Sequence, residues 1–96
     1  MKHEDQESNW TLLTNHGRIL LLLARDPEYL IKDLAADAGV TERRAQAILT
    51  DLEDAGYIKR RKDGRRNIYW VNMKSPFRHP SESGHKVGEL IKVFLD

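Results

Sequence analysis

The Asp63-Gly64 pair constrains the fold of this chain more than any other local feature, because it lies between two β-prone runs. Tyr57 and Ile58 precede the basic segment around the pair, and residues 68–71 (Ile-Tyr-Trp-Val) follow it. An Asp-Gly pair between such runs favours a two-residue type I′ turn, which needs positive φ at both central residues. We therefore predict a two-stranded antiparallel ribbon at this position.

The alternation of side chains along the ribbon predicts which of them it buries. A type I′ turn about Asp63-Gly64 would set Ile58 opposite Tyr69. Ile58, Tyr69 and Val71 would then share one face, which we assign to the core. Trp70 falls on the other face, where packing under the C-terminal segment is favoured over a position beside bound DNA.

Positive charge is concentrated on the same ribbon. Residues 1–58 carry 6 Lys or Arg and 11 Asp or Glu (net −5), residues 59–66 carry 6 and 1 (net +5), and residues 67–96 carry 4 and 3 (net +1). A localised basic patch is the electrostatic footprint expected of a nucleic-acid-binding protein. The alternative is a solvated ribbon that only aids solubility. The six cations are Lys59, Arg60, Arg61, Lys62, Arg65 and Arg66.

Length and composition limit the class of protein. The 96 residues, 40% of them hydrophobic, suffice for one small domain. With no cysteine, the chain has no disulfide and no thiolate metal ligand. Its polar, acidic start does not resemble a signal peptide, and the longest apolar run, Ile19–Ala24, is far too short to span a bilayer. We therefore expect a cytoplasmic protein.

Apolar periodicity and capping residues predict three helices before the ribbon and one after it. Thr14 is a capping residue for the first helix, Gly39 ends the second with a left-handed residue, and Thr41 is the expected N-cap of the third. Residues 1–9 are expected to form a flexible tail and residues 73–80 a loop. The predicted helices cover residues 16–25, 31–38, about 41–55 and 81–95.

The order helix, helix, short turn, helix, two-stranded ribbon is typical of a winged helix-turn-helix. We therefore predict an α+β, mostly α fold, with a three-helix core and a two-stranded β wing over residues 10–72. An additional C-terminal helix over residues 81–96 would serve packing or dimerisation. In such a domain the helix after the turn enters the major groove of DNA, and the wing touches the flanking backbone or minor groove.

The third predicted helix carries the side chains that would read DNA. Arginine can bind guanine bidentately, glutamine can bind adenine, and alanine can meet a thymine methyl group. The alternative for the two arginines is surface pairing with Glu42 or Asp51. Thr41, Thr50 and the six wing cations should mainly position the DNA backbone. The base-reading candidates are Arg43, Arg44, Gln46 and Ala47.

Two segments carry a resemblance to a known family. Residues 34–58, which contain Leu-Glu-Asp-Ala-Gly-Tyr-Ile, and residues 63–71, which contain Gly-Arg-Arg-Asn-Ile-Tyr, resemble the small bacterial and archaeal winged-helix transcriptional regulators of the ArsR/MarR type. The resemblance extends over roughly residues 10–95. It implies sequence-specific binding of duplex DNA, commonly by a homodimer on an inverted repeat, with repression relieved by an effector.

The chain departs from the metal-sensing members of that family. Leu30 and Lys32 occupy the positions of the two cysteines that those members carry, so that thiolate site cannot form. A second family site uses carboxylates and histidines of the C-terminal helix, whose spacing this chain does not match. We expect an ordinary i, i+4 surface pair at residues 85 and 89, and no metal or cofactor. The residues in question are His79, Glu82, His85 and Glu89.

No combination of residues supports catalysis, so the chain is not expected to be an enzyme. The prediction is a DNA-binding regulator, homodimeric through residues 10–13, the outer face of residues 19–23 and the C-terminal helix. The alternative is a winged-helix protein–protein interaction module without sequence-specific DNA binding. So short a chain leaves little room for a ligand pocket outside the dimer interface, and a second alternative is therefore a DNA-binding regulator with no small-molecule effector.

Overall fold

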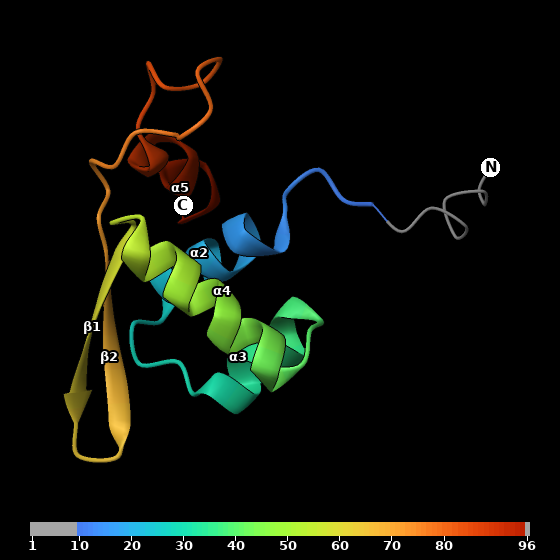
Figure 1. The fold of residues 1–96 in the computed structure, drawn as a ribbon, viewed down its shortest axis with the longest axis vertical. Helices are drawn as coiled ribbons and strands as arrows, with labels where there is room; N and C mark the ends of the chain where they lie inside the picture. The colour runs from blue at the N-terminus through green and yellow to red at the C-terminus, as the bar shows by residue number, and fades with distance from the viewer. Residues whose placement is uncertain (1–9, 96) are drawn as a thin grey trace.

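The computed structural model describes residues 10–95. Figure 1 shows three helices packed together, a hairpin along one side of them, and a last helix at the end opposite the hairpin turn. This arrangement confirms the predicted α+β, mostly α winged helix-turn-helix with an additional C-terminal helix. The tail expected over residues 1–9 lies outside the described residues. The elements are α2 (Asn15–Arg25), α3 (Ile31–Ala38), α4 (Glu42–Asp54), β1 (Ile58–Asp63), β2 (Arg66–Val71) and α5 (Val87–Leu95).

Side-chain caps fix the starts of α2 and α4. The Gly17 backbone N–H donates to Thr14 Oγ1 at 3.1 Å, and the Arg44 backbone N–H donates to Thr41 Oγ1 at 3.0 Å. Such a cap stabilises a helix by about 1 kcal/mol. Gly39 follows α3 with a φ of 77°, which lets the chain turn at once into α4. Both predicted caps and the predicted glycine turn are therefore confirmed.

The core lies where α2, α3 and α4 meet the inner face of the hairpin. α2 contacts α3, α4, β2 and α5, so it is the central element of the molecule. Ile19, Leu20, Leu21 and Leu23 are all buried, so α2 is covered on two faces. α5 supplies the second cover.

The turn of the hairpin differs from the predicted one. Asp63 pairs with Arg66, so the two central residues are Gly64 and Arg65 rather than Asp63 and Gly64. Gly64 has a φ of 66°, and no residue other than glycine has positive φ in the described chain. This is the pattern of a type II′ turn, which needs positive φ only at its first central residue. The prediction of a type I′ turn was wrong because one glycine can satisfy either register.

The two faces of the hairpin are nevertheless as predicted, because the pairing moves by two residues and side chains alternate with a period of two. Ile58 now opposes Val71, and Ile58 and Tyr69 are both buried. Trp70 lies on the outer face and is 47% exposed. The Arg61 guanidinium carbon lies over the Trp70 ring, 5.4 Å from its centroid. α5 contacts α2 and not the hairpin, so it does not form the expected cover over Trp70.

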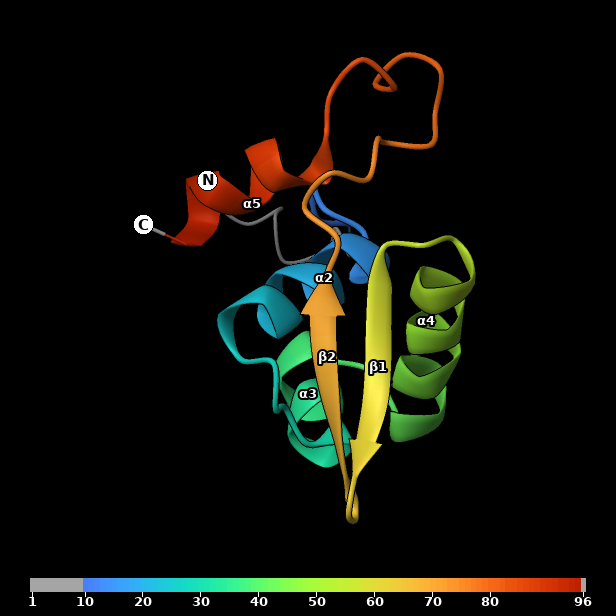
Figure 2. The same cartoon turned by 90° about the vertical axis from the view of Figure 1, so that its left-hand side faces the viewer.

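α5 begins at Val87, whereas the sequence predicted a start at residue 81. Pro76 and Lys86 form an isolated antiparallel bridge, so the chain just before Val87 is extended rather than helical. Glu89 Oε2 then accepts from the Lys86 backbone N–H at 3.0 Å, which caps the shorter helix. Figure 2 shows the resulting loop between β2 and α5. No helix among residues 10–95 is long and apolar enough to cross a membrane.

Candidate nucleic-acid interface

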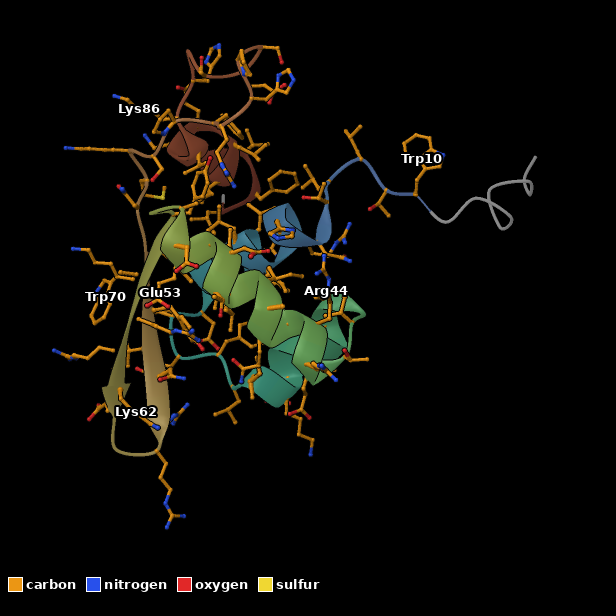
Figure 3. The ribbon with its side chains drawn as sticks, in the orientation of Figure 1. Trp10, Arg44, Glu53, Lys62, Trp70 and Lys86 are labelled. Atoms are coloured by element: carbon orange, nitrogen blue, oxygen red, sulfur yellow. The ribbon has the colours of Figure 1, made fainter. Side chains whose placement is uncertain are left out.

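α4 carries a fully exposed polar face opposite its buried stripe. The buried residues, Ala45, Ile48, Leu49 and Leu52, are those that the periodicity predicted. Figure 3 shows Arg44 on the surface of α4, away from the hairpin. The predicted DNA-contacting residues of α4 are all exposed, so a partner could reach each of them: Thr41, Arg43, Arg44, Gln46, Ala47 and Thr50.

The surface pairing considered for the two arginines of α4 does not occur among residues 10–95. Within this range, neither Arg43 nor Arg44 makes a side-chain hydrogen bond or an ion pair. Asp51 instead pairs with His16, whose Nε2 lies 2.8 Å from Asp51 Oδ2. Both guanidinium groups therefore have no partner within the described chain and are available to contact DNA bases.

The contact between His16 and Asp51 joins the start of α2 to the C-terminal half of α4. It is one of the contacts that orient α4 and was not predicted. The two residues are 35 positions apart, so no local pattern could have indicated their pairing.

We define the wing as residues 58–71. Contacts along its length hold it against the helical body. Arg60 Nε donates to Glu53 Oε1 of α4 at 3.1 Å. The Tyr69 backbone N–H donates to the Pro27 carbonyl at 2.9 Å, and Arg66 Nη2 donates to the Glu28 carbonyl at 3.2 Å. These bonds tie both strands to the body, so the hairpin projects as a fixed element.

The same contacts divide the six predicted wing cations into two groups. Arg60 and Arg66 bind the protein itself, and Arg61 lies over Trp70. The other three, Lys59, Lys62 and Arg65, make no ion pair within residues 10–95. Lys62 and Arg65 flank or form the turn, at the far end of the hairpin from α5 (Figure 3). They are thus the wing cations best placed to contact a polyanion.

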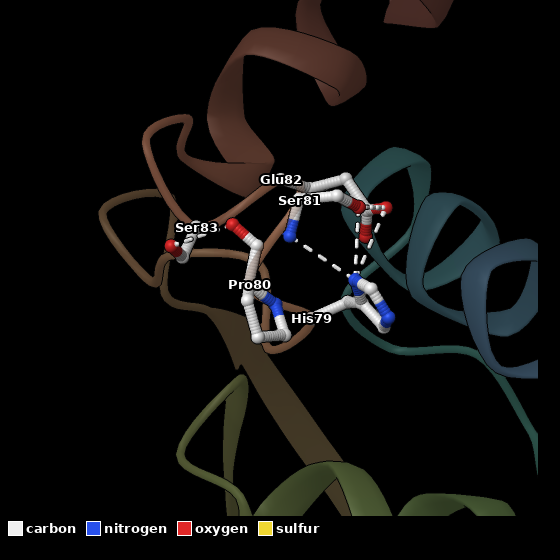
Figure 4. Close-up of polar contacts among 5 residues, drawn as sticks. All are labelled: His79, Pro80, Ser81, Glu82 and Ser83. Atoms are coloured by element: carbon white, nitrogen blue, oxygen red, sulfur yellow. Dashed lines mark hydrogen bonds and ion pairs between the residues drawn. The ribbon is translucent and has the colours of Figure 1, made fainter.

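The histidines and carboxylates near α5 form local pairs. His85 Nδ1 lies 2.8 Å from Glu89 Oε1, which confirms the predicted i, i+4 pair. The Lys86 backbone N–H and the His85 ring together lower the pKa of Glu89. His79 contacts Ser81 and Glu82 (Figure 4). Among residues 10–95, no three His, Cys, Asp or Glu side chains are grouped to hold a metal ion.

A pocket of about 570 Å³ lies between the start of α2, the end of α4 and residues 77–82. Residues of one chain suffice to line this pocket, and they include Leu20, Leu52 and Phe77. This hollow is larger than expected from the prediction that so short a chain leaves little room for a ligand pocket outside the dimer interface. The loop before α5 folds back over the helices and creates a hollow that helical periodicity does not reveal.

The three helices, the glycine turn, the capped exposed helix and the fixed basic hairpin together define a winged helix-turn-helix protein. The chain belongs to the winged helix-turn-helix DNA-binding family, whose model matches residues 12–59. No curated protein matches the chain significantly.

Several solved structures share the fold. A possible transcriptional regulatory protein from Mycobacterium bovis is 24% identical, with a TM-score of 0.56 over 86% of this chain and 76% of that chain. Lactococcus lactis ZitR in complex with DNA is 19% identical, with a TM-score of 0.57 over 92% of this chain and 61% of that chain. A further ZitR structure, described as a zinc-responsive MarR family member, is 22% identical, with a TM-score of 0.54 over 71% of this chain.

These likenesses show a common fold with MarR family structures, in agreement with the resemblance found in the sequence. This chain covers 49% of the zinc-responsive ZitR chain and 61% of the DNA-bound one. It therefore spans about half to three fifths of the length of those proteins.

Proposed function

We propose that this protein is a sequence-specific, double-stranded DNA-binding transcriptional regulator. α4 enters the major groove, and the wing contacts the flanking backbone or minor groove. The observation that most supports this function is the exposed face of α4, which carries Arg43 and Arg44, together with a basic hairpin that Arg60 holds to the same helix. The DNA complex of a protein with the same fold supports the same geometry.

The proposed contacts fall into two classes. Arg43, Arg44, Gln46 and Ala47 read base edges, because they lie on the N-terminal half of the exposed α4 face. The threonines at the two ends of that face and the free wing cations position the DNA backbone. Arg60 and Arg66 act mainly by holding the wing to the body.

We further propose that the regulator is a homodimer on an inverted repeat. Large apolar side chains are exposed on the N-terminal segment and at the end of α5. Figures 1 and 2 show that α5 lies at the end of the molecule opposite the wing turn. A second copy covering these residues would leave α4 and the wing of both copies free for DNA. The exposed residues are Trp10 (75%), Leu12 (90%), Val93 (71%), Phe94 (40%) and Leu95 (44%).

We propose that the protein acts in the cytoplasm, and that it acts by binding rather than by catalysis. Its family is defined by DNA binding.

A salt titration against random duplex DNA tests the proposal. If a dimer neutralises roughly 6–10 phosphates, the affinity falls about 10³–10⁵-fold between 50 and 200 mM salt. Fluorescence anisotropy of a labelled duplex measures this change. Absence of binding at low ionic strength would contradict the DNA-binding function and favour a protein–protein interaction module. Selection of bound sequences from a random duplex pool then tests sequence specificity.

A further inference from the structure

The pocket between α2, α4 and residues 77–82 has the dimensions of a small-molecule site. Its volume of about 570 Å³ lies within the range of roughly 300–1,000 Å³ that is typical of ligand pockets. Its lining includes none of the strongly exposed apolar residues at the N-terminal segment or the end of α5. A dimer formed through those residues would not by itself fill the pocket.

The floor of the pocket is apolar. It is formed by Leu20, Leu52, Tyr57, Phe77 and Val87, of which all but the half-buried Phe77 are at least nine-tenths buried. The Tyr57 hydroxyl donates to the Pro76 carbonyl at 2.9 Å, so Tyr57 brings no unsatisfied polar group to the floor. An aromatic or branched aliphatic group would therefore be stabilised there by burial.

The rim of the pocket carries an excess of negative charge. Three carboxylates, those of Asp51, Asp54 and Glu82, line it together with one guanidinium, that of Arg78. With the rim histidines neutral, the lining has a net charge of −2. Asp51 is hydrogen-bonded to His16, and Glu82 contacts Ser81 and His79 (Figure 4).

Asp54 differs from the other two carboxylates of the rim. Within the described residues, no side-chain hydrogen bond or ion pair involves it. A cationic group entering the pocket could bind Asp54 without breaking an existing contact. Because no three metal-binding side chains are grouped among residues 10–95, the charge and the apolar floor together suit an organic cation.

We infer that this pocket binds a small amphipathic organic cation, an aromatic or aliphatic group joined to an ammonium, as the effector of the regulator. The effector role rests on the proposed DNA-binding function, whereas the binding itself does not. The apolar part occupies the floor, and the ammonium lies at the rim between Asp54 and Glu82.

The position of the pocket explains how such a ligand would act on DNA binding. Its lining joins the end of α4, the start of α2 and the segment that leads into α5. The His16–Asp51 hydrogen bond, which ties α2 to α4, lies on the rim. Asp54 follows Asp51 on α4 by three residues, so a ligand held at Asp54 binds beside this link and changes how α4 is held against α2. By linkage, DNA changes the affinity for the ligand by the same factor.

Matched sets of compounds that differ only in charge test the binding. The first set is tryptamine, tryptophol and indole-3-acetate, and the second is 2-phenylethylamine, 2-phenylethanol and phenylacetate. Each is titrated into the ¹⁵N-labelled full chain without DNA. The two amines are expected to shift the amides of residues 51–55 and 77–82 and to bind about tenfold more tightly than their neutral and anionic counterparts.

Variants place the ligand at the rim. The double variant Asp54→Asn, Glu82→Gln is expected to weaken amine binding about tenfold. Asp33→Asn removes an exposed carboxylate of α3 and serves as the control, with unchanged binding. The inference is overturned if neither amine shifts these amides at millimolar concentration, or if the carboxylates bind as tightly as the amines.

A separate measurement tests the effector role. Saturating tryptamine is expected to change the affinity for selected DNA by at least about fivefold, the low end of typical allosteric coupling. An unchanged affinity would overturn the effector role. If the amines bind and DNA does not, only the proposed function fails; if DNA binds and the compounds are not discriminated by charge, only the pocket inference fails.

Discussion

At the scale of single residues, Arg44 and Arg65 are two cations without an ion-pair partner among residues 10–95, and they should contribute differently to DNA binding. Arg44 lies on the exposed face of α4, and Arg65 lies in the turn of the wing. Arg44→Ala is expected to cost about 1–3 kcal/mol on the selected sequence and to relax the preference at one base pair. Arg65→Ala should weaken binding to all sequences alike and reduce the salt slope by about one.

Binding to a panel of single-base variants of the selected sequence separates these two effects. The panel is measured at several salt concentrations for each protein. Equal losses on every sequence for Arg44→Ala would rule out its base-reading role. A change of base preference for Arg65→Ala would show that the wing also reads sequence.

Tyr29 gives a second prediction at the residue scale, on stability at high pH. Its hydroxyl donates to Asp37 Oδ2, and this hydrogen bond raises the pKa of Tyr29 to about 12 from the ordinary value of 10.0. In the unfolded chain the pKa returns to about 10. The stability from this group is therefore fully present below about pH 10 and is lost as the pH rises from about 10 to 12.

The free energy of unfolding across this range measures the effect. The wild-type curve should fall more steeply between about pH 10 and 12 than that of Tyr29→Phe. Asp37→Asn should bring the Tyr29 pKa back toward its ordinary value, as followed by tyrosinate absorbance. Identical slopes for the wild type and Tyr29→Phe would mean that the hydrogen bond does not hold the proton.

At the scale of elements, α5 is held in place by a glycine that allows close backbone contact. A Cβ built on Gly88 would lie 2.7 Å from the Met73 carbonyl oxygen, which accepts from the Gly88 N–H at 2.9 Å. Gly88→Ala is therefore expected to destabilise the protein by about 1–3 kcal/mol, because backbone must shift. Gly84→Ala is the matched control, since nothing lies within 4 Å of its added Cβ.

Denaturant unfolding of the two variants tests the docking of α5. A loss confined to Gly88→Ala fits the close contact, whereas equal stability of both variants would show that the junction with Met73 can relax. The same comparison shows whether α5 must dock on α2 for the rest of the domain to be stable.

The helices could be predicted from the sequence because their signals are local. Thr14 and Thr41 cap α2 and α4, and the buried stripe of α4 recurs at helical spacing. The exposed face of α4 consists of the residues that remain when the buried stripe is set aside. The candidate residues were chosen from this remainder, and all of them are exposed in the structure. The start of α5 could not be predicted in this way, because the Pro76–Lys86 bridge pairs residues across a loop.

The parts of the site that sequence did not reveal depend on tertiary contacts. The bonds of Arg60 to Glu53 and of His16 to Asp51 join separate elements, and each side chain alone resembles ordinary surface charge. The predicted turn type of the wing was wrong for another reason. Gly64 fits the second central position of a type I′ turn and equally the first central position of a type II′ turn.

At the scale of the whole molecule, charge and apolar surface lie at opposite ends. Outside residues 59–66 the chain carries 10 Lys or Arg and 14 Asp or Glu, a net charge of −4. Contact with DNA should therefore be confined to the wing and the α4 face. Among the described residues, most of the large exposed apolar side chains belong to α5 and the N-terminal segment, at the other end, whereas Leu30 and Trp70 lie elsewhere. This separation lets one end bind a second copy while the other binds DNA.

The proposed dimer gives the last prediction. Val93→Asp introduces a charge at a side chain that is 71% exposed, so the monomer should fold while a second copy is repelled from that surface. Sedimentation equilibrium should show a dimer for the wild type and a monomer for this variant. Lys92→Ala alters the adjacent exposed residue without adding a charge and should remain dimeric.

Selected sites for the wild type should contain half-sites about 34 Å apart, one helical turn of DNA, because two recognition helices enter successive major grooves. The affinity of Val93→Asp for a single half-site should change little, whereas the additional affinity that the wild type gains from a second half-site should be lost. A dimeric Val93→Asp, or selected sites without repeats, would place the interface elsewhere or show that the protein binds DNA as a monomer.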